Sequence, residues 1–233
     1  MDTNKIFTDF CNALSRRTRN LTEDNIRYYW FANMLKQDSE LDNYCLEEQY
    51  NPNLCQTLNL GHAELDLHYE GCIDNLCFEM KLHRFTGSTL TYTENVGKVI
   101  NDLRRLGAIT LPGSRKLFLY VTDDAMETHL LKATAGINSL PTYRSQVSAL
   151  FSLAPGQAIS LTFSASQVPD TFWREAAKSV PIPHPDSSFS LNLKLLDSAT
   201  IQCPAASCQT QDSSIPMPAS SSPDLHIRLF EVK

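Results

Sequence analysis

Several features common in enzymes and membrane proteins are missing from this sequence. Its eight glycines form no phosphate-binding loop, and no serine stands in the glycine-flanked turn of serine hydrolases. These absences exclude nucleotide kinases and serine hydrolases. No apolar run approaches membrane-spanning length, and residues 1–5 are too acidic and too poor in apolar side chains to begin a signal peptide. We therefore expect a cytoplasmic protein with no membrane partner.

Paired cysteines and an excess of basic charge are also lacking. The seven cysteines are irregularly spaced, and their odd number argues against a complete disulfide framework. Four residues separate Cys72 from Cys77, and four separate Cys203 from Cys208, a spacing that does not match common zinc sites. The net charge of −6 counts against a nucleic-acid binder, which usually has a basic surface. It does not exclude one, because attraction depends on the local potential.

The periodicity of apolar residues predicts an α/β protein with a mixed central sheet flanked by helices. Expected helices lie at 6–14, from Glu23 onward, and at 92–106, 124–135 and 170–178; expected strands lie at 64–70, 76–82, 116–122, 158–163, 189–196 and 225–232. An order of helix, hairpin, helix and apolar strand implies helices packed on a mixed sheet.

The chain is expected to consist of a core and a C-terminal, β-rich elaboration. The core spans residues 1–146, and the extension spans residues 147–233. Within the extension, the Ser- and Pro-rich segment 203–224 is typical of a loop or linker. The last strand is too apolar for a tail, so we expect it to return to the sheet and pack on the same domain.

The hairpin at 64–82 is the most informative part of the sequence. Apolar and polar residues alternate along both runs, which is typical of two half-buried strands joined by a turn at 71–75. A hairpin centred between Cys72 and Ile73 sets Asp66 opposite Glu79, with Cβ atoms about 5 Å apart. Lys81 shares that face. Two acids so close repel unless a proton or a divalent cation lies between them, so they form a candidate metal site.

Glu23 is expected to face the same sheet. It lies three residues before Ile26 and seven before Trp30, so it extends the buried stripe of its helix. A carboxylate that faces inward needs a partner such as a lysine, a metal ion or a metal-bound water. The alternative is that Glu23 only interacts with the helix dipole, as acids in a first turn do.

These residues together resemble the PD-(D/E)XK nuclease superfamily. The resemblance covers roughly residues 5–135 and consists of Glu23, Asp66, the Glu79-Met80-Lys81 run, and the helix of Lys98 leading into the strand at 116–122. Leu65 stands where the motif has its proline, and the helix after the motif lacks the glutamine of some branches. The resemblance implies a restriction-endonuclease-like core in the order αβββαβ.

The resemblance also implies a role for each residue. Asp66 and Glu79 would bind Mg²⁺ or Mn²⁺, with the Met80 carbonyl as a further ligand. Lys81 would position or deprotonate the attacking water, and Glu23 would complete the outer shell of the metal or hold a second ion. Two further residues on one helix face, Lys98 and Arg105, could contact the DNA backbone. The alternative is that both are simply solvated charges on the surface of the helix.

The resemblance thus implies an enzyme that hydrolyses DNA phosphodiesters with a divalent metal ion. Its expected partner is DNA, with a homodimer or a protein partner as a further option. The main alternative is a catalytically inactive nuclease-fold protein that acts as a binding or scaffolding module. The acidic balance favours that alternative, whereas the intact Asp66, Glu79 and Lys81 favour catalysis. A third reading is an unrelated α/β interaction protein with a charged strand facing solvent.

Overall fold

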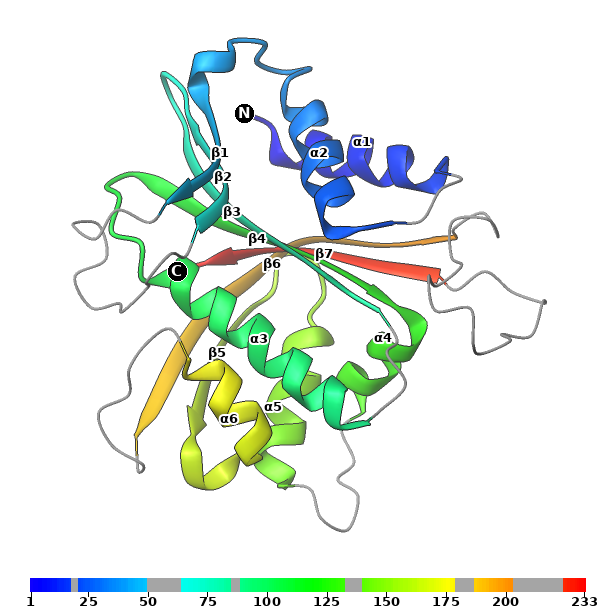
Figure 1. Cartoon of the computed structure of the whole chain (residues 1–233), viewed down its shortest axis with the longest axis vertical. Helices are drawn as coiled ribbons and strands as arrows, with labels where there is room; N and C mark the ends of the chain where they lie inside the picture. The colour runs from blue at the N-terminus through cyan, green and yellow to red at the C-terminus, as the bar shows by residue number, and fades with distance from the viewer. Residues whose placement is uncertain (18–20, 50–63, 85–88, 133–139, 179–186, 203–223) are drawn as a thin grey trace.

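A seven-stranded mixed sheet runs through the molecule in the order β1-β2-β3-β4-β7-β6-β5 (Figure 1). The computed structural model describes residues 1–17, 21–49, 64–84, 89–132, 140–178, 187–202 and 224–233. The strands are β1 (Tyr44–Gln49), β2 (Glu64–Glu70), β3 (Asn75–His83), β4 (Ser114–Asp123), β5 (Ala158–Ser164), β6 (Ser188–Gln202) and β7 (Asp224–Val232). Strands β3 and β4 pair in parallel, and the other described pairs are antiparallel.

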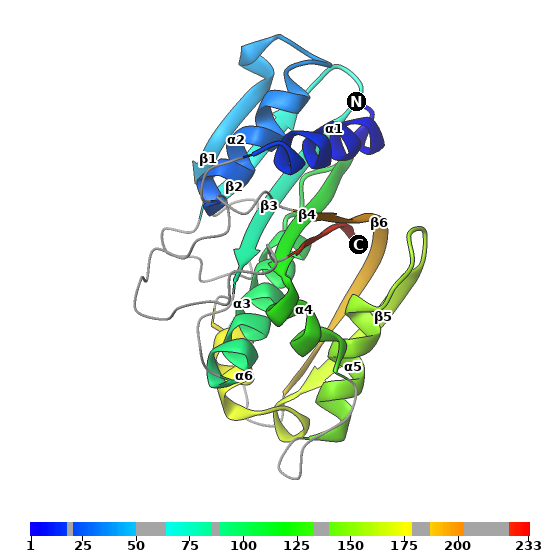
Figure 2. The ribbon, with the colours of Figure 1, turned by 90° about the vertical axis from the view of Figure 1, so that its right-hand side faces the viewer.

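Helices cover both faces of this sheet, so the predicted mixed α/β class is confirmed (Figure 2). The described helices are α1 (Thr3–Ser15), α2 (Glu23–Met34), α3 (Thr89–Gly107), α4 (Asp124–Leu131), α5 (Pro141–Phe151) and α6 (Asp170–Ala176). The first two share one core with the sheet, and the other four belong to a second core on the opposite face. None of the described helices is both long and apolar enough to span a membrane.

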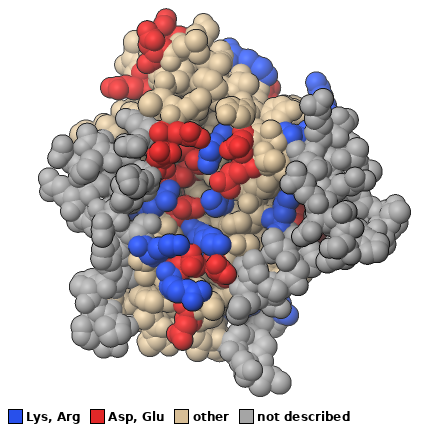
Figure 3. Space-filling model, viewed as in Figure 1, with Lys and Arg blue, Asp and Glu red and all other residues tan. Residues whose placement is uncertain are grey.

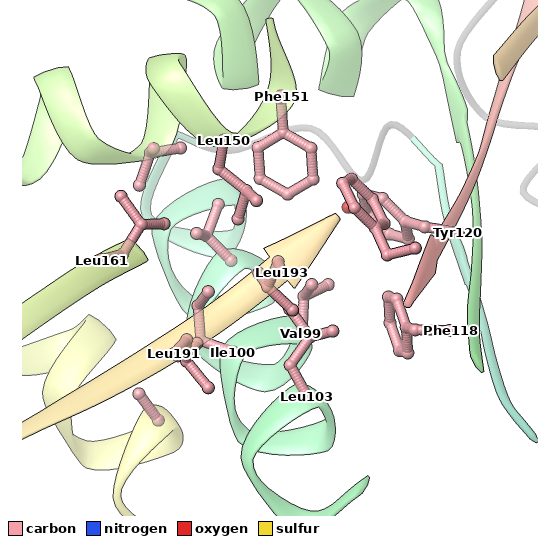
Figure 4. Close-up of a cluster of buried hydrophobic side chains, with 14 of the residues drawn as sticks. Val99, Ile100, Leu103, Phe118, Tyr120, Leu150, Phe151, Leu161, Leu191 and Leu193 are labelled. Carbon is pink, nitrogen blue, oxygen red and sulfur yellow. The ribbon is translucent and has the colours of Figure 1, made fainter. Parts of the chain in front are cut away.

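Strand β4 shows how one sequence run serves both cores. Its odd-numbered apolar residues lie in the core of α1 and α2, whereas Phe118 and Tyr120 lie in the other core. Figure 4 shows Phe118 and Tyr120 near Phe151 of α5 and Val99 of α3. A strand buried on both faces reads as a continuous apolar run, as the sequence indicated.

The residues after 146 continue the same sheet. Strand β7 pairs with β4 and lies between β4 and β6, so the last strand does return to the sheet. Except for its last residue, the Ser- and Pro-rich segment 203–224 lies outside the described residues. The expected helix at 124–135 is described only as far as residue 132.

Helix boundaries follow local capping signals. Thr22 caps α2: its hydroxyl accepts a hydrogen bond from the backbone N–H of Asn25, whose side chain in turn accepts from the Thr22 N–H. The side chain of Asp123 accepts from Met126 N–H and caps α4. Helix α5 was not predicted, although Pro141 at its first turn and its apolar spacing are helical signals.

Helix α6 lies against α3 because a glycine permits a close approach. A Cβ placed on Gly97 of α3 would lie only 2.7 Å from the backbone oxygen of Phe172 in α6. Any larger residue would push the two helices apart. The C-terminal elaboration therefore packs directly on the helix that also supplies residues to the candidate site.

Candidate functional site

The four predicted catalytic residues, Glu23, Asp66, Glu79 and Lys81, all line one pocket of about 290 Å³. The pocket is open to solvent where α2, β1, β2, β3 and α3 meet, and its full lining is Glu23, Arg27, Glu47, Glu64, Asp66, Glu79, Met80, Lys81, Asp102 and Arg105. Figure 3 shows acidic and basic side chains gathered in the middle of one molecular face. The lining is almost entirely charged, so the site suits a charged ligand.

The hairpin register agrees with the spacing in the sequence. Leu67 pairs with Phe78, and one further step along this register sets Asp66 opposite Glu79. Oδ2 of Asp66 accepts a hydrogen bond from the backbone N–H of Met80 at 2.6 Å. This contact fixes the Asp66 carboxylate between the two strands, beside Glu79 and on the side of the sheet that faces the pocket.

Glu23 joins α2 to β3 at the rim of the pocket. Nζ of Lys81 donates to Oε1 of Glu23 at 3.2 Å, and the backbone N–H of Leu82 donates to Oε2 at 3.3 Å. Glu23 therefore has the inward direction and the lysine partner that its place on the buried stripe suggested. The helix dipole alone does not account for its position.

Lys81 is held as an ammonium ion by the acids around it. Burial by itself lowers its pKa, but the attraction of Asp102, Glu23 and Asp66 outweighs burial, so the net pKa lies above its ordinary value. Lys81 is therefore protonated at neutral pH. In this state it supplies positive charge and hydrogen-bond donors, and it cannot accept a proton from water.

Two arginines contact the acids of the hairpin. Nε of Arg27 lies 3.0 Å from Oδ1 of Asp66, and its other nitrogens lie 3.2 Å from Glu47 Oε1 and 3.4 Å from Glu23 Oε1. From the opposite side, Nη2 of Arg105 donates to Oε1 of Glu79 at 2.7 Å. Each of the two carboxylates among the predicted metal ligands is thus paired with one guanidinium.

Burial also changes the pKa of two carboxylates in the pocket, those of Asp66 and Asp102. It raises the pKa of Asp66, although Arg27 and the Met80 N–H favour the ionised form. Burial likewise raises the pKa of Asp102, against the attraction of Arg105 and Lys81. Asp102 lies 3.9 Å from Lys81 Nζ and 3.7 Å from Arg105 Nη1. The pocket concentrates acids whose negative charge is costly without a cation.

The carboxylate oxygens of the pocket are suitable ligands for a divalent cation. As they are arranged, however, they do not surround a single point as the ligands of a bound metal ion would. Carboxylate oxygens such as those of Asp66 and Glu79 are the ligands that Mg²⁺ and Mn²⁺ prefer. Over the described part of the chain, no three His, Cys, Asp or Glu side chains are grouped as metal ligands. A cation on these carboxylates would have to replace the contacts of Arg27 and Arg105.

The structure separates the two residues predicted to contact DNA. Lys98 lies outside the pocket, half exposed, with its Nζ 3.4 Å from Oε1 of Glu94. Arg105 lies inside the pocket and contacts Glu79. Their shared role at the DNA backbone stays a prediction. The contact of Arg105 with Glu79 was not predicted from the sequence.

Sequence reasoning also missed several members of the site: Arg27, Glu47, Glu64 and Asp102. One signal was available for Asp102, which lies three residues after Val99 and four before Leu106, on the buried stripe of α3. Arg27 had a similar signal, four residues after Glu23. Glu47 has no local signal, because only the pairing of β1 with β2 brings it to the pocket.

No protein-family model, curated protein or solved structure matches this chain.

Proposed function

We propose that this protein hydrolyses DNA phosphodiesters with Mg²⁺ or Mn²⁺, as an enzyme of the PD-(D/E)XK type. The observation that carries the proposal is that Asp66, Glu79, Lys81 and Glu23 converge on one open pocket. The order from α2 to β4, which is helix, three strands, helix and strand, supports it. So does the sheet order β1-β2-β3-β4, in which the crossover through α3 joins parallel strands.

In this proposal Asp66 and Glu79 hold the cation. The bound ion would polarise the phosphate and lower the pKa of a water molecule. Asp66 is already positioned for this role by the Met80 N–H, which fixes one of its oxygens. The fixed carboxylate reduces the entropy lost when a ligand binds.

Lys81 supplies positive charge to the reacting phosphate. Its ammonium group is stabilised by Asp102, Glu23 and Asp66, so it is a hydrogen-bond donor at neutral pH. Negative charge grows on the phosphate oxygens in the transition state, and a fixed ammonium group stabilises that charge. Glu23 acts as a positioning residue, because it orients Nζ of Lys81 from the rim of the pocket.

The test is cleavage of supercoiled, linear, branched and single-stranded DNA with Mg²⁺ or Mn²⁺. We expect cleavage that EDTA abolishes and that Lys81→Ala reduces at least a hundredfold, about 2.7 kcal/mol of transition-state stabilisation. Lys5→Ala is the matched control, since Lys5 lies on α1 and pairs with Asp9. Equal activity in Lys81→Ala and the native protein would contradict the assignment.

A second candidate function is a nuclease-fold module that binds without cutting. It is favoured by the contacts of Arg27 with Asp66 and of Arg105 with Glu79, which give these two carboxylates a cationic partner other than a metal ion. The same assay separates the two candidates. DNA binding that is independent of Mg²⁺, with no cleavage of any of the four substrates, would support the module and overturn the enzyme.

A further inference from the structure

We propose that Arg27 and Arg105 compete with the divalent cation for Asp66 and Glu79, and bind the substrate phosphate once the cation takes those carboxylates. This inference rests on the proposed function. It assigns to two arginines a double role that the nuclease motif does not include: they hold the acids in the metal-free protein and bind phosphate in the loaded one.

The first support is the arrangement of the contacts. Arg27 reaches Asp66 from α2, and Arg105 reaches Glu79 from α3, at 3.0 and 2.7 Å. The two helices belong to different cores on opposite faces of the sheet. Two guanidiniums thus approach neighbouring carboxylates from two sides, and both contact the oxygens that a cation would need.

The second support is the charge of the pocket. Its lining holds six acidic residues and three basic ones, a formal excess of three negative charges. The arginines therefore do not balance the acids. A divalent cation would reduce this excess, and its arrival would leave the arginines free to take a new anion.

The third support is that Arg27 is incompletely satisfied. Its Nε is buried and makes no hydrogen bond to the described atoms, because the contact with Asp66 is close but poorly aligned. Glu47, another partner of Arg27, has a φ of 54°, in the left-handed region that a non-glycine residue seldom adopts. A planar guanidinium fits the oxygens of a phosphate well, so phosphate would satisfy this donor better.

The test measures cation binding and DNA binding separately, without relying on cleavage. Mn²⁺ affinity is measured by calorimetry on the native protein, Arg105→Met and Arg27→Met. We expect each variant to bind Mn²⁺ about tenfold more tightly, because a competing positive charge has been removed. Affinity for a DNA duplex in Ca²⁺ should fall about tenfold in the same variants.

The opposite signs of the two changes exclude simple damage to the fold, which would weaken both kinds of binding. Arg115→Met is the control, because Arg115 pairs with Glu231 at 2.9 Å outside the pocket and should alter neither affinity. Unchanged Mn²⁺ affinity in both variants would overturn the inference but leave the proposed metal site intact. Failure of the native protein to bind Mn²⁺ would overturn both.

Discussion

Nζ of Lys81 donates a hydrogen bond to Oε1 of Glu23 across 58 positions of sequence, and this contact joins the second helix to the third strand. The carboxylate also accepts the backbone N–H of Leu82. One side chain of α2 thus orients the lysine and, together with Asp102 and Asp66, stabilises its positive charge. The contact gives the first prediction.

Replacing Glu23 with Gln should lower the pKa of Lys81. Gln keeps a side-chain oxygen but removes one of the negative charges that raise this pKa. More of the amine is then neutral at pH 9, and its labelling by acetic anhydride, followed by mass spectrometry, should become severalfold faster. Asp24→Asn is the control, because Asp24 contacts Arg27 and not Lys81. An equal effect of both variants would contradict the prediction.

The second prediction concerns the buried ion pair of Arg228 and Glu127. Nη1 of Arg228 donates to Glu127 at 2.8 Å, and Nη2 donates to both Glu127 and the Phe151 carbonyl, the latter at 2.9 Å. Arg228→Met leaves a buried carboxylate without its cation, so the free energy of unfolding should fall by about 3–5 kcal/mol. Urea denaturation measures the change.

The comparison for that variant is Arg115→Met, which breaks a more exposed pair with Glu231. This change should cost about 0–1 kcal/mol, since solvent screens the charges. Equal losses in the two variants would show that Arg228 does not act through its buried pairing.

Gly97→Ala should weaken the packing of α6 on α3. The added Cβ would lie 2.7 Å from the backbone oxygen of Phe172, and backbone cannot yield as a side-chain tip can. We expect a loss of about 1–3 kcal/mol, measured by thermal or urea unfolding. In the same helix, Gly107→Ala meets only a methyl group of Val232 at 3.3 Å and should cost less. The reverse order of the two losses would refute this account.

Stability should fall between pH 7 and pH 5 because of His83. Burial, with Lys81 and Lys98 nearby, lowers the pKa of His83 from 6.5 to about 3. The unfolded chain therefore binds a proton in this range while the native protein does not, so acid favours unfolding. The loss attributable to this histidine is about 2 kcal/mol at pH 5.

His83→Gln should reduce that loss, as judged by urea denaturation at pH 7 and pH 5. Gln retains a group that can hydrogen-bond the Tyr120 hydroxyl, which lies 3.1 Å from Nδ1 of His83. His226→Gln, which changes a histidine bonded to Asp124 on the surface, is the control. An undiminished loss in His83→Gln would assign the acid sensitivity to other groups.

Local patterns predicted much of this protein correctly. The alternation at 64–82 gave both strands and a register consistent with the observed pairing of Leu67 with Phe78. Thr22 marked the start of α2, and the buried stripe of that helix indicated that Glu23 faces inward. These features depend on residues close in sequence, for which side-chain direction follows from helical or strand geometry alone.

The contacts that define the chemical state of the pocket could not be predicted in this way. The pairing of Arg27 with Asp66 and of Arg105 with Glu79 joins residues 39 and 26 positions apart, and depends on how two helices cross the sheet. The same holds for Asp102 beside Lys81. The sequence alone determined which acids and which lysine share a hairpin face. Only the tertiary structure decided which basic side chains pair with those acids. The reason is that electrostatic attraction depends on the distance between two charges in space, and burial raises the free-energy cost of each charge.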